Sequence, residues 1–301
     1  MTSTYHAGEL TIQIQAGVRT EAARLTKIID ANISSTSRDF LSRQRLAIAS
    51  TVDRNGRIWA SLLTGKPGFV QAVAAQLVQV QTTAVPSDPL LENLSIRDDI
   101  GILVIDLATR RRLRINGKAE LKPNDRIDVR TQQVYFNCPK YIQMRDLIAR
   151  SDRQETVPEV YSYTALTSAQ QQSIAQADTF FIASFHPQGG ADASHRGGYP
   201  GFVQVVNATE LVFPDYAGNN MFNTLGNIAQ NPQIGLLFID FACGRTLQLT
   251  GTAKIIWDLN RLAQFIGAER LVEFHIDRVL ETTNATTLRW EFREYSPYNP
   301  R

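Results

Sequence analysis

The stretch SHRGGYPGFVQVV, residues 194–206, carries at its centre a segment that the chain uses twice. PGFVQ begins here at residue 200 and also at residue 67, in SLLTGKPGFVQAV, so the two copies are 133 positions apart. Three further pairs of segments recur in the same order at an offset of 134: residues 100–106 and 234–240, residues 113–119 and 247–253, and Asn93-Leu94 and Asn227-Ile228. Four matches in one order predict an internal duplication, and the alternative is that β-rich segments resemble one another by chance.

Each copy shows the same succession of expected elements. A strand, at residues 45–51 or 179–185, is followed by a turn in which Asn-Gly or Gly-Gly supplies the positive φ angles of a hairpin. A second strand leads into PGFVQ, and a helix is expected at residues 88–97 or 219–230. An apolar run and an alternating segment then predict two more strands. We therefore expect a mainly β (α+β) protein with small closed or split β-barrels rather than a parallel sheet.

The expected organisation is an N-terminal extension, two repeats and a tail. The extension is expected at residues 1–35 and contains an amphipathic helix at residues 20–33. The two repeats are expected at residues 36–150 and 160–292, and the tail at residues 293–301. The polar segment 149–157 is expected to connect the repeats, and a short helix at 167–176 to introduce the second one. Pro139 suits the first turn of a further helix after the first repeat.

The composition argues against several classes of protein. Of the 301 residues, 43% are hydrophobic and 20% charged, which disfavours a disordered or a membrane protein. A net charge of +2 gives no strong field for nucleic acid, and we interpret Arg110-Arg111-Arg112 as a solvated turn. Cys138 and Cys243 match no zinc spacing, so we expect no metal, two reduced thiols and a cytoplasmic location. The N-terminus lacks the pattern of a secretory signal.

The two copies differ in a way that predicts an anion site. Arg196 falls opposite Leu63, and glycines follow it in the second copy. Arginine binds phosphate with two parallel hydrogen bonds, and glycines let backbone N–H groups approach an oxyanion. A helix beginning near Asn219 would direct its free N–H groups to the same place. The second copy therefore predicts a phosphate cradle, and the alternative is a polar loop with a solvated arginine and an asparagine helix cap.

Two segments resemble a known family. SHRGGYPGFVQV and PDYAGNNMFNTLGNIAQNPQIGLLFIDF are similar to the FMN-binding split-barrel family typified by pyridoxamine 5′-phosphate oxidase, and more closely to its "pyridoxamine 5′-phosphate oxidase-related" branch. The resemblance covers residues 38–290 and implies a homodimer-like pair of split barrels with FMN in the cleft between them. It also implies that the FMN phosphate and ribityl chain are held by Ser194, Arg196, Asn219, Asn223 and Thr224.

The resemblance implies further contacts and has limits. Gly197, Phe202 and Val203 are expected along the isoalloxazine ring. Met221 stands where members of the branch carry a basic residue. The substrate-binding residues of the oxidases do not map onto the C-terminal sequence, so the resemblance carries over FMN but not pyridoxamine phosphate.

Duplication and resemblance together predict two tandem FMN-binding split barrels that form an intrachain pseudo-dimer. We expect one FMN per chain, with its phosphate on the second copy and its ring capped by the first. Candidates for the capping face are Cys138, Lys140 and Tyr141, with Arg114 also within reach. The alternatives are a small buried apolar role for Cys138 and a surface pair for Lys140 and Tyr141. His195 is expected either to contact phosphate or substrate or to serve the loop alone.

The function implied is that of an FMN-dependent oxidoreductase acting on an unknown small molecule. A partner reductase is a candidate electron donor, because the tail REYSPYNPR has the composition of a linker. The alternative is a flavin- or haem-binding protein without turnover, such as a sensor, a store or an assembly factor. We expect no membrane or nucleic-acid partner, and a monomer with an internal pseudo-dimer or a homodimer.

Overall fold

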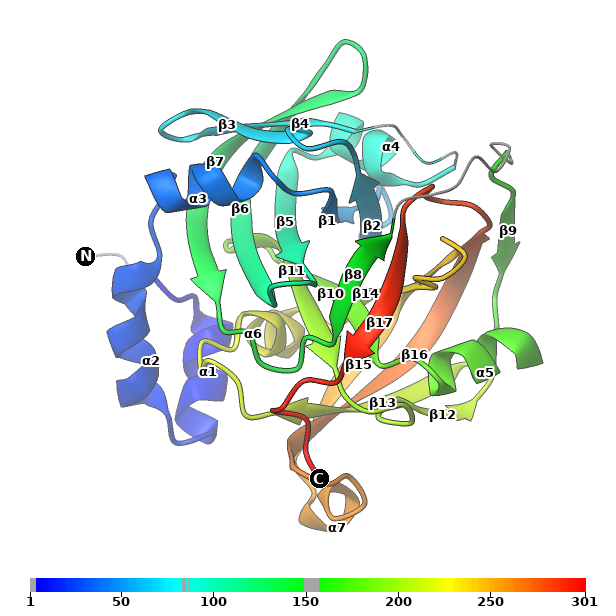
Figure 1. The fold of residues 1–301 in the computed structure, drawn as a ribbon. Coiled ribbons are helices and arrows are strands. Elements are labelled where there is room, and N and C mark those ends of the chain that lie inside the picture. Colours follow the sequence, from blue (N-terminus) through cyan, green and yellow to red (C-terminus); the bar gives the residue numbers. More distant parts are fainter. Residues whose placement is uncertain (1–3, 83–84, 86, 149–156) are drawn as a thin grey trace.

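The computed structural model describes residues 4–82, 85, 87–148 and 157–301. Two large antiparallel sheets lie face against face, with short helices around them (Figure 1). The mainly β class predicted from the sequence is thereby confirmed. Most of the predicted connector at residues 149–157 lies outside the described residues.

The first sheet contains seven strands in the order β2-β1-β5-β6-β7-β4-β3. Their bounds are β1 Leu46–Val52, β2 Ile58–Thr64, β3 Val70–Ala74, β4 Leu77–Gln81, β5 Asp99–Asp106, β6 Arg111–Lys122 and β7 Arg126–Asn137. The two strands expected at residues 45–51 and 100–106 are present, and both are buried almost throughout. Such continuous apolar runs are expected for strands that are covered on both faces.

The second sheet contains β11-β10-β14-β15-β16-β13-β12 in that order, and a short strand β9 pairs with β16. The bounds are β9 Val160–Tyr163, β10 Thr179–His186, β11 Gly190–Gly197, β12 Gln204–Asn207, β13 Glu210–Tyr216, β14 Gln233–Ile239, β15 Thr246–Ile256 and β16 Ala268–Thr282. When the strands of the two seven-strand paths are numbered from β1 in the first sheet and from β10 in the second, the two paths have the same strand order. Equal order in two sheet bodies is consistent with a tandem duplication.

Apolar side chains form one core inside each sheet body and a third core between them. Leu113 lies in the first core and Phe180 in the second. The core between the bodies joins Ile48 and Ile58 of the first sheet to Phe181 and Leu237 of the second. Burial of this shared apolar surface fixes the two sheets against each other, and with them the walls of any cleft along the seam.

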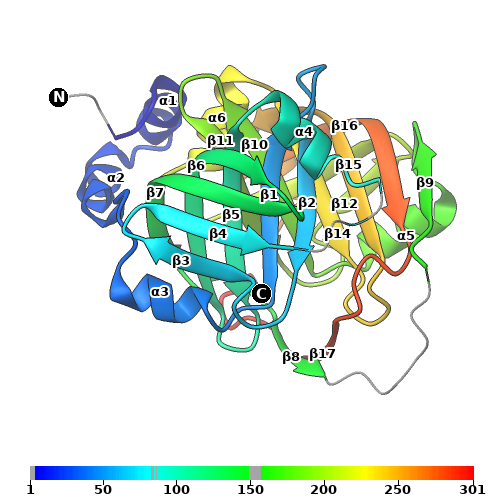
Figure 2. The ribbon, with the colours of Figure 1, turned by 90° about the horizontal axis from the view of Figure 1, so that it is seen from above.

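Short helices surround the sheets, and α6 packs across β10 and β15 of the second sheet (Figures 1 and 2). They are α1 Ala7–Gln15, α2 Arg19–Leu25, the 3₁₀ turn η1 Thr26–Ile28, α3 Ser35–Leu41, α4 Leu90–Ile96, α5 Ser168–Ala175, α6 Asn223–Gln230 and α7 Leu259–Leu262. The single helix expected at residues 20–33 is therefore shorter, because α2 passes into a 3₁₀ turn. The sequence analysis also missed α1, which packs on α6. None of the helices in the described ranges has the length and apolar character needed to cross a membrane.

Two expectations about the ends of the repeats are wrong. Pro139 does not begin a helix; it lies in a turn before β8, Met144–Ile148, which pairs with β17, Arg289–Glu294. The tail is not a free linker either. Ser296 and Asn299 are buried, and both donate hydrogen bonds to the side-chain oxygen of Gln143 at 2.7 and 3.1 Å. The tail thus supports the segment that joins β7 to β8.

Candidate functional site

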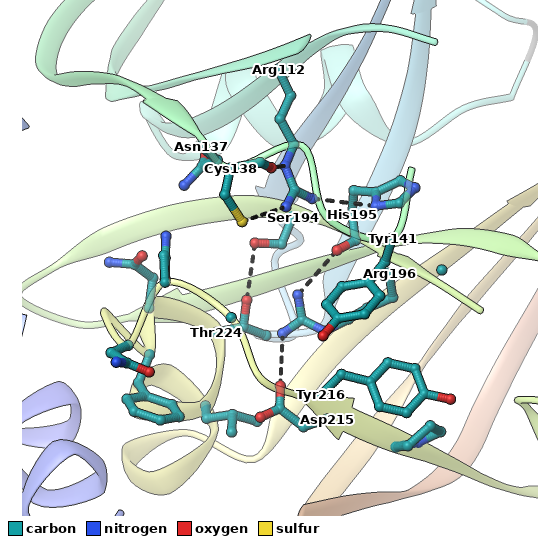
Figure 3. A pocket seen from close by; sticks show the side chains of 18 of the residues that line it. Arg112, Asn137, Cys138, Tyr141, Ser194, His195, Arg196, Asp215, Tyr216 and Thr224 are labelled. Atoms are coloured by element: carbon teal, nitrogen blue, oxygen red, sulfur yellow. Dashed lines mark hydrogen bonds and ion pairs between the residues drawn. The ribbon is translucent and has the colours of Figure 1, made fainter. Parts of the chain in front are cut away.

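A cleft lies on the seam between the halves of the chain, and each half supplies one wall (Figure 3). The first half contributes β6 and the residues that follow β7. The second half contributes the end of β11, the end of β13 and the first turn of α6. The enclosed space is about 100 Å³, which is less than the ~300 Å³ at the lower end of pockets that enclose a whole small ligand. The cleft is therefore deep enough for a small anionic group and open at its mouth.

The structure brings most of the predicted site residues together along this cleft. Those that line it are Cys138, Tyr141, Ser194, His195, Arg196, Gly197, Phe202, Asn219, Asn223 and Thr224, together with Arg114. Val203 does not line it, because its side chain is buried in the core of the second sheet. Lys140 does not line it either; its Nζ lies 3.4 Å from the carbonyl oxygen of Ala217, and Tyr298 lies beneath its ammonium group. Sequence analysis missed Arg112, Asn137, Asp215, Tyr216 and Phe222.

Strand β6 presents two arginines to the cleft. Arg112 and Arg114 are two positions apart, so they lie on one face of the strand, while Leu113 between them faces the core. The interpretation of Arg110-Arg111-Arg112 as a solvated turn is therefore wrong for Arg112. Arg110 does lie at the turn, with a positive φ of 53°. Successive side chains of a strand point to opposite faces, so the three arginines have different surroundings. The run of arginines in the sequence does not show where the strand begins.

Arg112 is the cation of the cleft that lacks a counter-charge. Its Nε donates to the carbonyl oxygen of Cys138 at 3.0 Å, and its Nη1 lies 3.3 Å from Nδ1 of His195. Among the described residues, no carboxylate forms an ion pair with it. Burial lowers the pKa of Arg112 to about 10. A half-buried guanidinium without a carboxylate is costly, and an anionic ligand would reduce that cost.

Arg114 joins the two walls. It is 5% exposed, forms an ion pair with Asp192 at 3.1 Å, and donates from Nη1 to Tyr135 and Asn223 at 3.0 and 2.8 Å. A further hydrogen bond from Nη2 reaches the hydroxyl of Ser194. Burial opposes the charged form, but the carboxylate of Asp192 raises the pKa of Arg114. This arginine is therefore held charged and in a fixed orientation at the base of the cleft.

Arg196 lies on the second wall and is only loosely paired. Its Nη1 donates to the carbonyl oxygen of His195 at 3.1 Å, and its Nη2 lies 3.7 Å from Asp215. Asp215 is shared, since Nε of Arg270 donates to its other oxygen at 3.0 Å. Burial lowers the pKa of Arg196. Three arginines, Arg112, Arg114 and Arg196, thus line the cleft with one lining carboxylate among the described residues, that of Asp215, so the cleft has an excess of positive charge.

The first turn of α6 faces the same space. Phe222, the residue before the helix, has a left-handed φ of 62°, and among the described residues no side chain caps the helix. The hydroxyl of Thr224 donates to that of Ser194 at 3.2 Å. Asn219 serves the turn itself, because its side chain accepts from the backbone N–H of Met221 at 3.1 Å. Uncapped N–H groups at a helix start favour an anion, as the arginines do.

The mouth of the cleft is framed by two tyrosines. Tyr141, at a positive φ of 65°, donates from its hydroxyl to the carbonyl oxygen of Ala217 at 2.9 Å. Its ring centre lies 5.1 Å from that of Tyr216. Close contact with Gly197 holds this loop, because a Cβ at Gly197 would lie 2.1 Å from the carbonyl oxygen of Tyr141. Two aromatic rings at the entrance suit a planar group above the anion site.

The equivalent place on the other side of the seam is closed. At the repeat offset, Leu63 replaces Arg196 and Gln248 replaces Arg114. The carboxyl of Asp88 fills the position; it accepts hydrogen bonds from Ser61 at 2.6 Å and from Gln248 at 2.9 Å. The remaining cavity is about 10 Å³. Among the described residues, the two equivalent places on the seam therefore differ, and the one beside Arg196 is the more open.

One family model matches the part of the sequence that forms the second wall of the cleft. The family model described as pyridoxamine 5′-phosphate oxidase matches residues 166–289. This part of the chain is thus similar to the pyridoxamine 5′-phosphate oxidase family. The matched region contains Ser194, Arg196 and Thr224, whereas Arg112 and Arg114 lie outside it.

Several solved structures resemble part of the chain. HupZ from Group A Streptococcus is 14% identical with a TM-score of 0.32, and the match covers 38% of this chain and 92% of that one. A putative pyridoxamine 5′-phosphate oxidase from Lactobacillus delbrueckii is 16% identical with a TM-score of 0.32, over 39% and 94%. The FAD binding protein from Mycobacterium smegmatis is 12% identical with a TM-score of 0.29, over 40% and 98%. No curated protein matches the sequence.

Proposed function

We propose that the chain binds one FMN in this cleft and acts as an FMN-dependent oxidoreductase. The observation that carries the proposal is the convergence of Arg112, Arg114 and Arg196 on the uncapped first turn of α6. Arginines, hydroxyls and free backbone N–H groups are the donor set that binds a phosphate monoester. The match of residues 166–289 to the family model described as pyridoxamine 5′-phosphate oxidase supports the same ligand.

The residues along the cleft, from its base to its mouth, match successive parts of FMN. The phosphate would lie at the base, where Arg196, Ser194 and Thr224 provide donors. Arg112, which lacks a carboxylate partner, would face the phosphate or the polar edge of the ring. The adjacent rings of Tyr141 and Tyr216 would contact one side of the flavin ring at the mouth, because the enclosed space of about 100 Å³ does not take the whole cofactor.

FMN, when bound, supplies hydride transfer, and the protein binds, orients and polarises it. His195 is not suited to proton transfer in this cleft. It is 3% exposed, and burial, followed by the charges of Arg112 and Arg196, holds its pKa well below the usual value. With Nδ1 facing Arg112, the neutral ring accepts there and keeps the arginine in place. We therefore assign His195 a positioning role.

The first experiment measures flavin stoichiometry. Purified protein, reconstituted with FMN, should show the absorption spectrum of a flavoprotein and release FMN on heating, identified by mass spectrometry, at one per chain. Two per chain, or none after reconstitution, would refute the single-site proposal.

A matched pair of variants locates the site. Arg196→Leu copies the residue of the first repeat and should weaken FMN binding by about tenfold or more, because a charge-assisted hydrogen bond to a buried group contributes about 1.5–3 kcal/mol. Arg24→Leu removes an exposed arginine of α2 and should leave FMN affinity unchanged. Equal affinities in the two variants would place the flavin elsewhere.

Turnover is tested separately from binding. Anaerobic addition of NADPH or NADH, alone and with a flavin reductase, should bleach the bound flavin, and air should restore the colour. Flavin that stays oxidised under every condition would instead favour a binding protein without turnover. Both walls of the cleft come from one chain, so we propose that a monomer is sufficient for binding.

A further inference from the structure

A second, larger pocket lies at the base of the first sheet, away from the cleft. It is enclosed by the end of α3, the start of β1, the turn between β5 and β6, and the β8–β17 ribbon, and it has a volume of about 460 Å³. This volume lies in the range of ~300–1,000 Å³ that small-molecule sites have. None of the residues assigned to the flavin cleft lines it.

The inner wall of this pocket is apolar. Phe40, Leu46, Leu107 and Trp290 line it, and each belongs to one of the hydrophobic cores. Leu147 of β8 adds an exposed aliphatic side chain at the edge. A hydrophobic wall beside a large opening favours a ligand with an apolar body.

The rim of the pocket is cationic. Arg43, Arg45 and Arg111 line it, and within the described ranges none of them forms an ion pair. The guanidinium of Arg111 lies 5.1 Å from the ring centre of Phe40 and 5.0 Å from that of Phe136. Two aspartates, Asp39 and Asp106, also line the pocket, so the rim carries one more positive than negative charge before Arg145 is counted.

Arg145 of β8 supplies a buried donor without a partner. It is 8% exposed, and its Nη2 donates to both carboxylate oxygens of Asp178 at 2.6 and 2.7 Å. Its Nη1 is buried, and no hydrogen-bond partner for it exists among the described residues. Native proteins rarely leave such a donor unsatisfied, so an unpaired guanidinium nitrogen on a pocket wall indicates a place for an acceptor.

The corresponding pocket of the second sheet lacks the cations of Arg43 and Arg45, although Arg145 lines both pockets. Strands β1 and β10 correspond at an offset of 133, so Gln176 stands for Arg43, Ala177 for Gln44 and Asp178 for Arg45, and all three line that second pocket. Arg245, which corresponds to Arg111, is neutralised by Asp240 and Glu281 at 3.7 and 3.2 Å. The cationic rim is therefore specific to the first sheet and does not follow from the fold alone.

We propose that the pocket beneath the first sheet binds an amphipathic organic anion, such as an aromatic phosphate or carboxylate. The apolar body would lie on Phe40, Leu107 and Trp290, and the anionic group would accept hydrogen bonds from Arg43, Arg45 and Nη1 of Arg145. This site is separate from the flavin cleft, and it does not depend on the function proposed for that cleft.

The test uses 1-naphthyl phosphate as the probe and protein loaded with one equivalent of FMN and freed of excess, so that the anion site of the cleft is filled and no free FMN competes for the second pocket. Wild-type protein should bind about one probe per chain with a Kd below about 1 mM, measured by naphthalene fluorescence and calorimetry. The neutral 1-naphthol should bind at least about tenfold more weakly. Undetectable binding of the phosphate, or equal binding of the neutral analogue, overturns the proposal.

Two variants and a matched control locate the probe. Arg43→Ala, at an exposed position, and Arg45→Ala should each weaken the probe by about tenfold, whereas Arg24→Ala should leave it unchanged. Far-ultraviolet circular dichroism and thermal melting confirm that each variant folds. Wild-type affinity in both variants overturns the proposal. Retained probe binding in Arg196→Leu protein without FMN separates this site from the cleft, whatever the outcome of the flavin experiment.

Discussion

Nη1 of Arg114 lies 2.8 Å from Oδ1 of Asn223 and donates a hydrogen bond to it across the seam between the two sheets. The amide nitrogen of the same Asn223 donates to Glu9 on α1 at 2.5 Å. Three segments far apart in the sequence are thereby joined at the base of one cleft. The position of the first turn of α6 depends on all three.

Arg114→Gln copies the residue found at the equivalent position of the second repeat. The variant should bind FMN at least about tenfold more weakly, because it removes the charge that orients Ser194 and Asn223. Calorimetric titration with FMN measures the change. Arg111→Gln, on the opposite face of the same strand, is the control and should retain wild-type affinity. Unchanged affinity in Arg114→Gln would contradict the assignment of β6 to the cleft.

Gly197→Ala should disturb the mouth of the cleft. The added Cβ would lie 2.1 Å from the carbonyl oxygen of Tyr141, and backbone cannot move aside as a flexible side chain can. We expect a loss of about 1–3 kcal/mol in the free energy of unfolding and weaker FMN binding. Urea titration gives the first quantity. Gly218→Ala, where the nearest atom lies 3.8 Å away, should change stability by less than about 0.5 kcal/mol.

Gly8→Ala tests the contact between α1 and α6. Alanine is favoured over glycine in helices by about 1 kcal/mol, so propensity alone predicts a gain. A Cβ at Gly8 would instead lie 2.1 Å from the carbonyl oxygen of Gly226, and α1 would have to move. We expect a net loss of stability in denaturant titration and a weaker flavin site. A stabilised variant would show that α1 is not held against α6 in solution.

Asp88 makes stability depend on pH. Burial raises its pKa from 3.8 to about 6, so the folded protein holds the proton more tightly than the unfolded chain. The stability contributed by this protonation is fully present below about pH 4 and is lost as the pH rises through about 6. Relative to Asp88→Asn, wild-type protein should lose on the order of 1 kcal/mol between pH 4 and pH 7, since Asp88 keeps part of its surface exposed. Urea titrations at a series of pH values measure the difference, and a constant difference would argue against a buried Asp88.

Local patterns predicted the fold class, and the resemblance to the split-barrel family implied most of the predicted residues that line the cleft. The repeated PGFVQ and the paired apolar strands indicated two similar sheet bodies, and SHRGG marked the end of β11. The residues opposite it were harder to place. Lys140 and Tyr141 are neighbours, yet only Tyr141 lines the cleft, because its positive φ turns the chain between them. Arg112 was missed because its side chain direction depends on where β6 begins.

Contacts between distant segments could not be inferred from sequence patterns. The segment after Pro139 has polar and apolar residues compatible with a helix, but β8 pairs with β17, about 145 residues away. The tail was interpreted as a linker from its composition, and its buried Ser296 and Asn299 become understandable only once Gln143 is seen beside them. In both segments, the observed structure depends on contacts with residues that lie far away in the sequence.

The closed position around Asp88 has a consequence for how this protein can change. In a dimer of identical subunits, every substitution appears in both active clefts at once, so a gain on one wall must be tolerated on the other. Here Leu63 and Gln248 stand where the open cleft has Arg196 and Arg114, so the two walls of that cleft are encoded by different residues. A mutation that changes Tyr141 or Arg112 therefore alters one wall without a symmetry-related change, and selection can act on that wall of the cleft alone.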